Sequence, residues 1–389
     1  MIDRTITTKL LELSAKYPVT VLSGPRQSGK TTLLKALFPT LPYANLEDPD
    51  VRNRALADPR LFLQHYPGGA LLDEAQRVPE LFSYLQGIVD NDRNIHFILS
   101  GSQHFLLMEK VTQSLAGRAA ILKLLPFSME ELKSAQLLPP TLEEILYQGM
   151  FPAIYDRQYL PGDFYPSYLE TYVERDVRQV KNIGNLNDFI RFMRLCAGRV
   201  GQLLNISSLA TDAGISPNTA KAWLSILEAS FVVFQVLPHH RNFNKRLVKT
   251  PKLYFYDTGL ACSLLFIEHA DQLLTHHQRG ALFENFIVAE MLKKRFHAAK
   301  TSNLYFWRDN HGNEVDLLLE TADQLTPIEI KSGMTQNTAY FKGLDYWHQL
   351  AGTDPQSGFV IYGGNETVLT TQGKLVSWRE LGGRNDWAY

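Results

Sequence analysis

Near the start of the chain, a run of eight residues has the types and spacing of a loop that binds phosphate groups. The run consists of Gly24, Pro25, Arg26, Gln27, Ser28, Gly29, Lys30 and Thr31, and Thr32 follows it. Its pattern is G-x-x-x-x-G-K-[ST], placed between a strand-like run at residues 19–23 and a helical pattern at residues 31–38. In such a loop the glycines let backbone N–H groups converge on phosphate oxygens, and the helix N-terminus favours negative charge. The alternative is a glycine-rich turn that binds nothing, but such a turn would not need Lys and Thr at fixed places.

Two side chains of this loop are expected to act on a nucleoside triphosphate. Lys30 would neutralise the β and γ phosphates, and the Thr31 hydroxyl would complete the shell of a magnesium ion, with Thr32 beside it on the helix. The loop therefore predicts ATP and Mg2+ as cofactors and Lys30 as a catalytic residue.

Two acids follow a second apolar run. Asp73 and Glu74 come directly after the Ala-Leu-Leu of residues 70–72. Because open α/β sheets bind ligands at the carboxyl ends of their strands, we expect both acids beside the phosphate loop. There Asp73 would hold the magnesium ion through water, and Glu74 would polarise the attacking water as general base. Taken alone, two acids after an apolar run would more often start a helix.

A third apolar run, at residues 97–99, leads to Ser100, Ser102 and Gln103. Either one of them senses the γ phosphate, for which we assign Ser102, or they cap the following helix. Arg118 stands after a glycine and before another apolar run. It is expected either to reach nucleotide as an arginine finger, in its own subunit or in a neighbouring one of a homo-oligomer, or to be an ordinary surface arginine.

A different set of charged residues lies in the last third of the chain. Glu284 falls on a predicted helix, Asp316 on a predicted strand, and Glu329 and Lys331 on the next strand. Residues two apart on a strand face the same side, so Glu329 and Lys331 can both face a metal held by Asp316. This order of an acid, an Asp and a Glu-x-Lys pair resembles the sites of restriction-type nucleases, in which the acids bind magnesium and the Lys stabilises charge. The alternative is a sheet edge whose Glu and Lys alternate with apolar residues.

The middle of the chain has the spacing of a helix-turn-helix. Gly214 suits the turn, Ser216 a helix cap and Pro217 the first helical position. Residues 175–252 carry 12 Lys and Arg against four Asp and Glu, a local balance of +8 within a chain of net charge -1. Such segregation is expected of a contact with the phosphates of DNA, or else the segment is a protein-binding module. The basic residues that we assign to this contact are Lys221, Arg241, Lys245, Arg246, Lys249 and Lys252.

The elements that position these residues divide the chain into three regions. Strand-like and helical runs alternate in the first third, which predicts a parallel sheet covered by helices. The middle third reads as helical up to about residue 230, and the last third begins with a long helix and continues with alternating strands. We expect an ATPase domain at residues 1–135, a helical and winged-helix-like domain at 136–270 and an α/β domain at 271–389.

The composition is that of an ordinary packed chain. It has 389 residues, 45% of them hydrophobic and 20% charged, which argues for more than one core and against disorder. Cys196 and Cys262 are too few for a disulfide framework or a four-cysteine zinc site. The first residues mix charges among the apolar positions, and no apolar run approaches the length of roughly 20 residues needed to span a membrane. We therefore expect a cytoplasmic protein with no membrane partner.

Together the motifs resemble a bacterial and archaeal family in which an AAA-type P-loop ATPase domain is followed by an uncharacterised domain. In the first domain the resemblance rests on residues 23–32, 71–76 and 99–103, and further along on residues 172–177, 252–259, 306–308 and 314–316. It implies an α/β fold with a nucleotide site, then a winged-helix-like part, then an end domain like the PD-(D/E)xK nucleases. Of the protein's properties, the resemblance implies the nucleotide site first, and it does not specify a cellular role. The activity that we expect is an ATPase coupled to binding or remodelling of DNA. The alternative is a nucleotide-controlled switch or scaffold that binds a protein partner, with a nuclease-like domain that is not catalytic.

Overall fold

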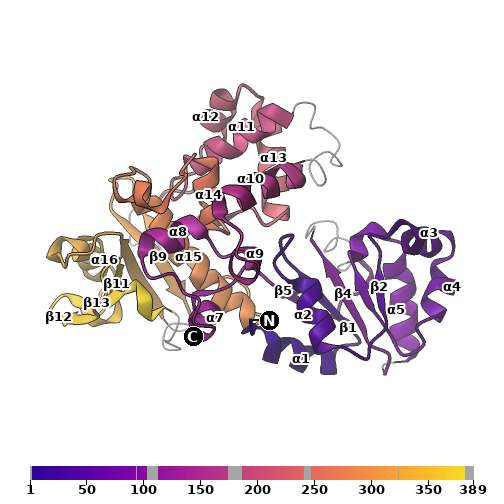
Figure 1. The fold of residues 1–389 in the computed structure, drawn as a ribbon. Coiled ribbons are helices and arrows are strands. Elements are labelled where there is room, and N and C mark those ends of the chain that lie inside the picture. The colour runs from indigo at the N-terminus through magenta and orange to yellow at the C-terminus, as the bar shows by residue number, and fades with distance from the viewer. Residues whose placement is uncertain are drawn as a thin grey trace. The chain divides into compact units, whose positions relative to one another are not determined.

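The computed structural model describes residues 2–92, 94–102, 113–173, 186–240, 247–322 and 324–381 (Figure 1). The chain forms two compact units. The first comprises Met1–Phe127 with the short segments Ala229–Phe231 and Phe296–Thr301, and the second comprises the remainder. The predicted second and third domains therefore share one unit, and their boundary at residues 270 and 271 stays a prediction.

The first unit is built on a five-stranded sheet whose strand pairs are all parallel. Its order is β2-β3-β4-β1-β5, so the strand before the phosphate loop lies between β4 and β5. The strands are β1 (Val19–Ser23), β2 (Tyr43–Asn45), β3 (Leu71–Asp73), β4 (Phe97–Gly101) and β5 (Ala119–Lys123). This confirms the parallel α/β sheet predicted for the N-terminal region. Since the strands run in one direction, their carboxyl ends meet at one edge.

Helices cover both faces of this sheet. Val21 belongs to one buried cluster and its neighbour Leu22 to the other, as the two-residue period of a strand requires. One face packs against α1 (Thr7–Lys16) and α2 (Lys30–Leu37). The other face packs against α3 (Pro49–Ala57), α4 (Pro59–Gln64) and α5 (Leu81–Asn91). The short helix η1 (Ala75–Arg77) follows β3 after a single residue, Glu74.

The second unit begins with helices. They are α7 (Met129–Ser134), α8 (Leu142–Gln148), α9 (Pro152–Asp156), α10 (Pro161–Tyr172), α11 (Leu186–Ala197), α12 (Ile206–Ala213) and α13 (Pro217–Ala229). A further helix, α14 (Thr258–Leu264), comes after two strands. Ser128 and Glu131 form a capping box that starts α7 at Met129. Between α12 and α13 the chain turns as predicted. Gly214 takes a left-handed conformation with φ 72°, and the Ser216 hydroxyl accepts a hydrogen bond from the Thr219 N–H over 3.1 Å.

An eight-stranded mixed sheet completes the second unit, in the order β12-β13-β11-β10-β9-β8-β6-β7. Its strands are β6 (Val233–Pro238), β7 (Lys252–Phe255), β8 (Leu304–Arg308), β9 (Glu314–Glu320), β10 (Leu325–Lys331), β11 (Phe359–Tyr362), β12 (Val368–Thr370) and β13 (Gly373–Ser377). The helices that accompany the sheet are α15 (Arg279–His297) and α16 (Lys342–Ala351). One face of the sheet buries Trp307, Val315 and Trp347 in an apolar core. No described helix is long and apolar enough to cross a membrane.

Candidate functional site

The phosphate-loop pattern lies between β1 and α2. Gly24 leaves β1 where the backbone passes so close to β5 that an added Cβ would lie 2.0 Å from the Leu124 carbonyl oxygen. Gly29 caps α2 in a left-handed conformation with φ 91°. Both glycines are therefore required by the backbone path, one by close approach and one by its positive φ.

Lys30 lies inside the loop. Its side chain is 5% exposed, and its Nζ donates to the carbonyl oxygens of Gly24 over 2.9 Å and Pro25 over 2.7 Å. An ammonium group held by neutral carbonyls at the start of a helix is ready to exchange those acceptors for phosphate oxygens, which carry charge. Thr32 is exposed on the same helix.

Asp73 ends β3 and receives hydrogen bonds from several elements. The Thr31 hydroxyl donates to its Oδ2 over 2.7 Å, so the two residues predicted to hold magnesium are in contact. Its other donors are the Tyr43 hydroxyl at 3.0 Å, the Glu74 backbone N–H at 3.1 Å and the Ser100 hydroxyl. The adjacent carboxyl ends of β3 and β4 explain this convergence. Tyr43, on the edge strand β2, was not expected from the sequence.

Glu74 follows Asp73 with a left-handed backbone, φ 53° and ψ 44°. Its Oε2 accepts hydrogen bonds from Gln76 Nε2 over 2.5 Å and from the Ser102 hydroxyl over 3.0 Å. Ser100 thus contacts Asp73, and Ser102 contacts Glu74. Gln103, the third candidate γ-phosphate sensor, lies outside the described residues.

Two arginines near the loop were not assigned a role from the sequence. Arg4 is buried, and its guanidinium donates to the carbonyl oxygens of Ser28 over 2.8 Å and Leu125 over 2.6 Å. Arg77 lies 3.7 Å from Glu47, and Arg26 of the loop lies 3.9 Å from the same carboxylate oxygen. The sequence around each arginine does not predict these contacts, because the groups that the arginines bind come from other segments of the chain.

The structure does not bring Arg118 to this edge. Its backbone carbonyl accepts from the N–H of Val19, the first residue of β1, so Arg118 lies at the amino edge of the parallel sheet. Its guanidinium makes two bonds to the Asp90 carboxylate, at 2.5 and 2.8 Å. The prediction that Arg118 contacts the nucleotide of its own subunit is therefore wrong, because the phosphate loop lies at the opposite, carboxyl edge of the sheet. Contact with a neighbouring subunit stays a prediction.

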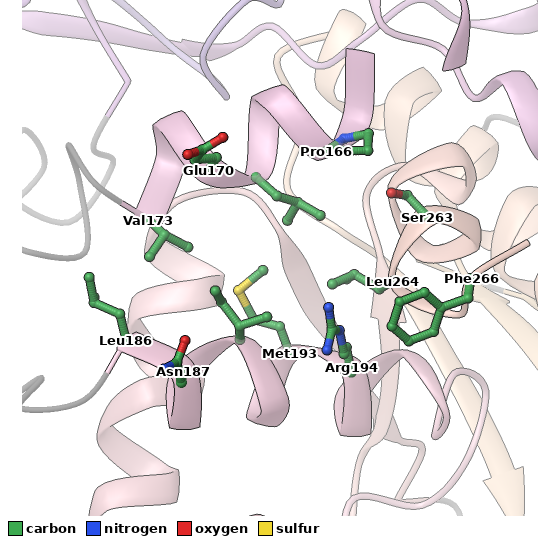
Figure 2. A pocket seen from close by; sticks show the side chains of 12 residues that line it. Pro166, Glu170, Val173, Leu186, Asn187, Met193, Arg194, Ser263, Leu264 and Phe266 are labelled. Carbon is green, nitrogen blue, oxygen red and sulfur yellow. The ribbon is translucent and has the colours of Figure 1, made fainter. Parts of the chain in front are cut away.

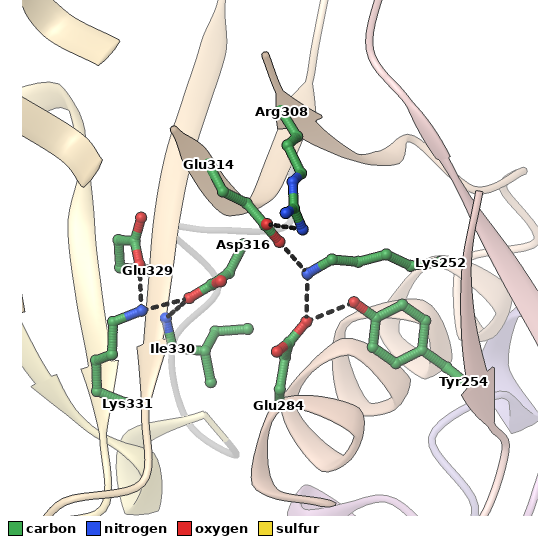
Figure 3. Close-up of polar contacts among 9 residues, drawn as sticks. All are labelled: Lys252, Tyr254, Glu284, Arg308, Glu314, Asp316, Glu329, Ile330 and Lys331. Atoms are coloured by element: carbon green, nitrogen blue, oxygen red, sulfur yellow. Dashed lines mark hydrogen bonds and ion pairs between the residues drawn. The ribbon is translucent and has the colours of Figure 1, made fainter. Parts of the chain in front are cut away.

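A second charged cluster forms in the C-terminal part of the chain (Figure 3). Lys331 Nζ lies 2.8 Å from Asp316 Oδ2 and also binds Glu329 Oε2. The backbone N–H of Ile330 donates to the same Asp316 oxygen over 2.8 Å. Three of the four residues predicted to converge are therefore in direct contact, across the neighbouring strands β9 and β10.

Glu284, the fourth of these residues, joins the cluster through Lys252. Its Oε1 accepts from Lys252 Nζ over 2.9 Å and from the Tyr254 hydroxyl over 2.6 Å. Lys252 also lies 2.5 Å from Glu314, which pairs with Arg308 at 3.0 Å. Glu314 was among the residues that carry the resemblance but was assigned no role in the site, although it stands two residues before Asp316 and so faces the same side of β9.

Lys252 corrects one sequence prediction. We expected it on a surface that contacts DNA, but its side chain is 3% exposed and held by carboxylates. Of the other basic residues assigned to that surface, Lys221 and Lys249 are exposed. Arg241, Lys245 and Arg246 lie outside the described residues, as do residues 174–177 of the motif at 172–177.

Burial and charge act against each other in this cluster. Burial raises the pKa of Glu284 and Glu329, and the neighbouring Asp316 carboxylate raises both further. Burial would also raise the pKa of Asp316, but the Lys331 and Lys252 ammonium groups lower it to about 2. Asp316 is thus the carboxylate that these two lysines keep ionised.

The cluster does not fit a divalent metal in this arrangement. The Lys331 ammonium binds both Asp316 and Glu329, the carboxylates expected to share the ion. In the part of the chain that the structure describes, no group of three or more His, Cys, Asp or Glu side chains is arranged to hold a metal. The described arrangement therefore supports no metal-dependent step at this place.

A pocket of about 750 Å3 lies between α10, α11 and α14 (Figure 2). Its lining is mainly aliphatic, and its charged members are Glu170 and Arg194. The Arg194 guanidinium lies 4.5 Å from the ring centroid of Phe266. None of the residues predicted to form a site lines this pocket.

Comparison with protein families gives three consecutive matches. Residues 16–133 match the family described as AAA domain. Residues 139–271 match a domain of unknown function, DUF8612, and residues 279–381 match a second one, DUF4143. The N-terminal region is thus an AAA-type, P-loop ATPase-like domain.

Similar proteins occur in bacteria and archaea. The uncharacterized protein Rv2008c of Mycobacterium tuberculosis is 30% identical over 324 residues, which cover 82% of this chain and 71% of that protein. The uncharacterized protein MJ1544 of Methanocaldococcus jannaschii is 24% identical and is covered to 75%. Among solved structures, the Walker-type ATPase PABY2304 of Pyrococcus abyssi is similar over 68% of this chain and 96% of its own, with 19% identity and a TM-score of 0.46.

Proposed function

Because this chain belongs to the family of the mycobacterial protein Rv2008c and carries an AAA domain, we propose that it binds and hydrolyses ATP. The observation that carries the proposal is the hydrogen bond of 2.7 Å between Thr31 and Asp73. It joins the helix after the phosphate loop to the acid at the end of β3, with Glu74 next in the chain. These are the parts that P-loop enzymes need around the γ phosphate.

The donor set at this edge fits magnesium. Thr31 offers a hydroxyl oxygen and Asp73 a carboxylate, and hard divalent ions prefer oxygen ligands. These two residues would hold the ion, directly or through water. When bound, the ion would neutralise charge on the phosphates.

The remaining steps fall to the chain's own residues. Lys30 and the backbone N–H groups of the loop bind and orient the β and γ phosphates. Glu74 accepts a proton from the attacking water. This step needs a carboxylate near the end of β3, where Glu74 stands. The Lys30 carbonyl contacts are exchanged for phosphate contacts on binding, which keeps the buried ammonium group satisfied.

Two variants of the full-length chain test this function. Lys30→Ala should abolish nucleotide binding, and Glu74→Gln should retain binding while stopping turnover. Binding would be measured with a fluorescent ATP analogue and turnover by phosphate release in the presence of Mg2+. Hydrolysis retained in both variants would overturn the assignment.

We propose further that ATP hydrolysis is coupled to DNA binding by the middle region. Support comes from the basic balance of residues 175–252, from the turn between α12 and α13, and from the exposed side chains of Lys221 and Lys249. The antiparallel pair β6 and β7 follows α13, as in a winged helix. The alternative is a nucleotide-controlled switch that holds a protein partner.

DNA binding is tested by its dependence on salt. Each phosphate contact removed should lower the slope of log affinity against log salt by about 1. Lys221→Ala and Lys249→Ala should show this loss, whereas Lys9→Ala, in the first unit, serves as the matched control. No complex at low salt, together with hydrolysis that rises only with added protein, would favour the switch.

For the end region we propose a fold like the PD-(D/E)xK nucleases with a cluster that is neutralised by its own lysines. Support comes from Asp316, Glu329 and Lys331 on adjacent strands, with Lys252 on Glu284. The fold by itself does not establish cleavage. DNA scission that requires Mg2+ or Mn2+ and disappears in Asp316→Ala and Lys331→Ala would instead establish an active nuclease.

A further inference from the structure

We propose that Gln76 is a positioning residue for Glu74: with Ser102 it fixes one carboxylate oxygen, so that the other is presented to the attacking water. This inference rests on the proposed ATPase function and adds a residue to its machinery. Gln76 donates from Nε2 to Glu74 Oε2 over 2.5 Å, and Ser102 donates to the same oxygen over 3.0 Å. Two donors on one oxygen restrict rotation of the carboxylate and leave Oε1 to accept a proton.

Charge decides the orientation of the Gln76 amide. If its oxygen and nitrogen were exchanged, the amide oxygen would face the Glu74 carboxylate and the two would repel. The side chain is 6% exposed, so it has little room to adopt another conformation. In the present orientation, Gln76 Oε1 is a buried atom with no hydrogen-bond partner among the described residues. The bond to Glu74 is thus kept at the expense of an unsatisfied carbonyl oxygen.

The backbone connects the two residues rigidly. Glu74 has a left-handed conformation, and the helical turn η1 starts immediately after it. The Arg77 N–H donates to the Glu74 carbonyl oxygen over 2.9 Å, which closes the turn. Gln76 therefore reaches back to Glu74 from within one turn. Ser102 approaches from β4, a different element, so the carboxylate is held from two sides.

In the reaction, the oxygen of water would form a bond to the γ phosphorus while the bond from that phosphorus to the β–γ bridging oxygen breaks. One proton of the water passes to Glu74 Oε1 and is then released, and ADP and phosphate leave. A general base must be fixed within hydrogen-bond reach of this water. Gln76 touches neither the water nor the phosphate in this scheme, and it acts only through Glu74.

The test uses Gln76→Met in the full-length protein, because methionine has a similar length and no hydrogen-bond donor. We expect kcat for ATP hydrolysis to fall by about 100-fold while KM and ATP affinity stay unchanged. Ser102→Ala should lower kcat in the same way, whereas Ser102→Thr, which keeps the hydroxyl group, should retain the kcat of the unmodified protein. Gln64→Met, an exposed glutamine of α4, is the matched control.

A double variant separates positioning from general damage to the fold. Glu74→Asp keeps a carboxylate but shortens its side chain, so it should lower kcat without stopping turnover. Adding Gln76→Met to Glu74→Asp should cause a smaller further loss of kcat than Gln76→Met causes in the unmodified protein, because Gln76 acts through Glu74. An unchanged or increased kcat in Gln76→Met alone, or a loss that is additive with that of Glu74→Asp, would overturn this inference. Wild-type hydrolysis no faster than that of Lys30→Ala would instead overturn the ATPase function itself.

Discussion

Lys252 Nζ lies 2.9 Å from Glu284 Oε1, and this buried ion pair joins β7 to α15. Its lysine comes from the end of the basic stretch, whereas its glutamate comes from the region expected to resemble a nuclease. The pair therefore connects two parts of the chain that the sequence presents as separate in charge and in fold.

Removing this lysine should destabilise the second unit. Lys252→Met keeps most of the side chain's length but leaves Glu284 without its buried counter-charge, while Glu314 keeps its pair with Arg308. The free energy of unfolding should fall by about 3–5 kcal/mol, the usual result of breaking a buried pair from one side. Urea unfolding of the full-length chain measures it. Lys249→Met, at an exposed position, should change it by less than about 0.5 kcal/mol, and an equal effect of both variants would contradict the prediction.

Asp316 should make stability depend on pH in the acid range. Burial opposes its ionisation, but Lys331 and Lys252 lower its pKa from 3.8 to about 2. A carboxylate with a lower pKa in the folded state stabilises the fold above pH 4, and this contribution disappears as pH falls toward 2. Asp316→Asn should therefore reduce the loss of stability between pH 4 and 2, by about 2 kcal/mol. Unfolding curves at several pH values measure this difference, with Asp92→Asn as a control at an exposed position. The prediction would be contradicted if Asp316→Asn lost as much stability between pH 4 and 2 as the unmodified protein.

Arg118→Ala should leave ATP hydrolysis unchanged in an isolated subunit. Its guanidinium binds Asp90 at the amino edge of the first sheet, away from the phosphate loop. Phosphate release measured at low and high protein concentration tests this. A loss of about 1,000-fold that appears only at high concentration would mean that Arg118 serves the nucleotide of a neighbouring subunit.

The placement of the residues proposed to bind nucleotide was largely predictable from the sequence because their pattern is local. The loop at residues 24–31 specifies strand, turn and helix together, and the parallel sheet then brings Asp73 and Glu74 to the same edge. Arg118 shows the limit of this reasoning. A residue between two apolar runs can lie at either edge of a sheet, and only the direction of β5 decides which one.

Lys252 and Tyr43 show a second limit. Lys252 lies in a segment with an excess of basic residues, but the glutamates that it binds lie 32 and 62 positions further along the chain. The charge of the segment therefore does not indicate that this side chain is buried. Tyr43 reaches Asp73 from the edge strand β2, and no spacing rule connects the two. Both depend on strand order, which a single sequence does not reveal.

The Arg4 contacts affect where a stable ATPase fragment can begin. Arg4 lies before residue 16, where the match to the AAA domain starts, yet its guanidinium connects the phosphate loop at Ser28 to Leu125 beyond β5. A fragment cut to residues 16–133 would keep every residue of the phosphate-binding pattern and lose this link. A fragment made for nucleotide-binding studies should therefore include Arg4, and a fragment without it would not be a fair test of nucleotide binding.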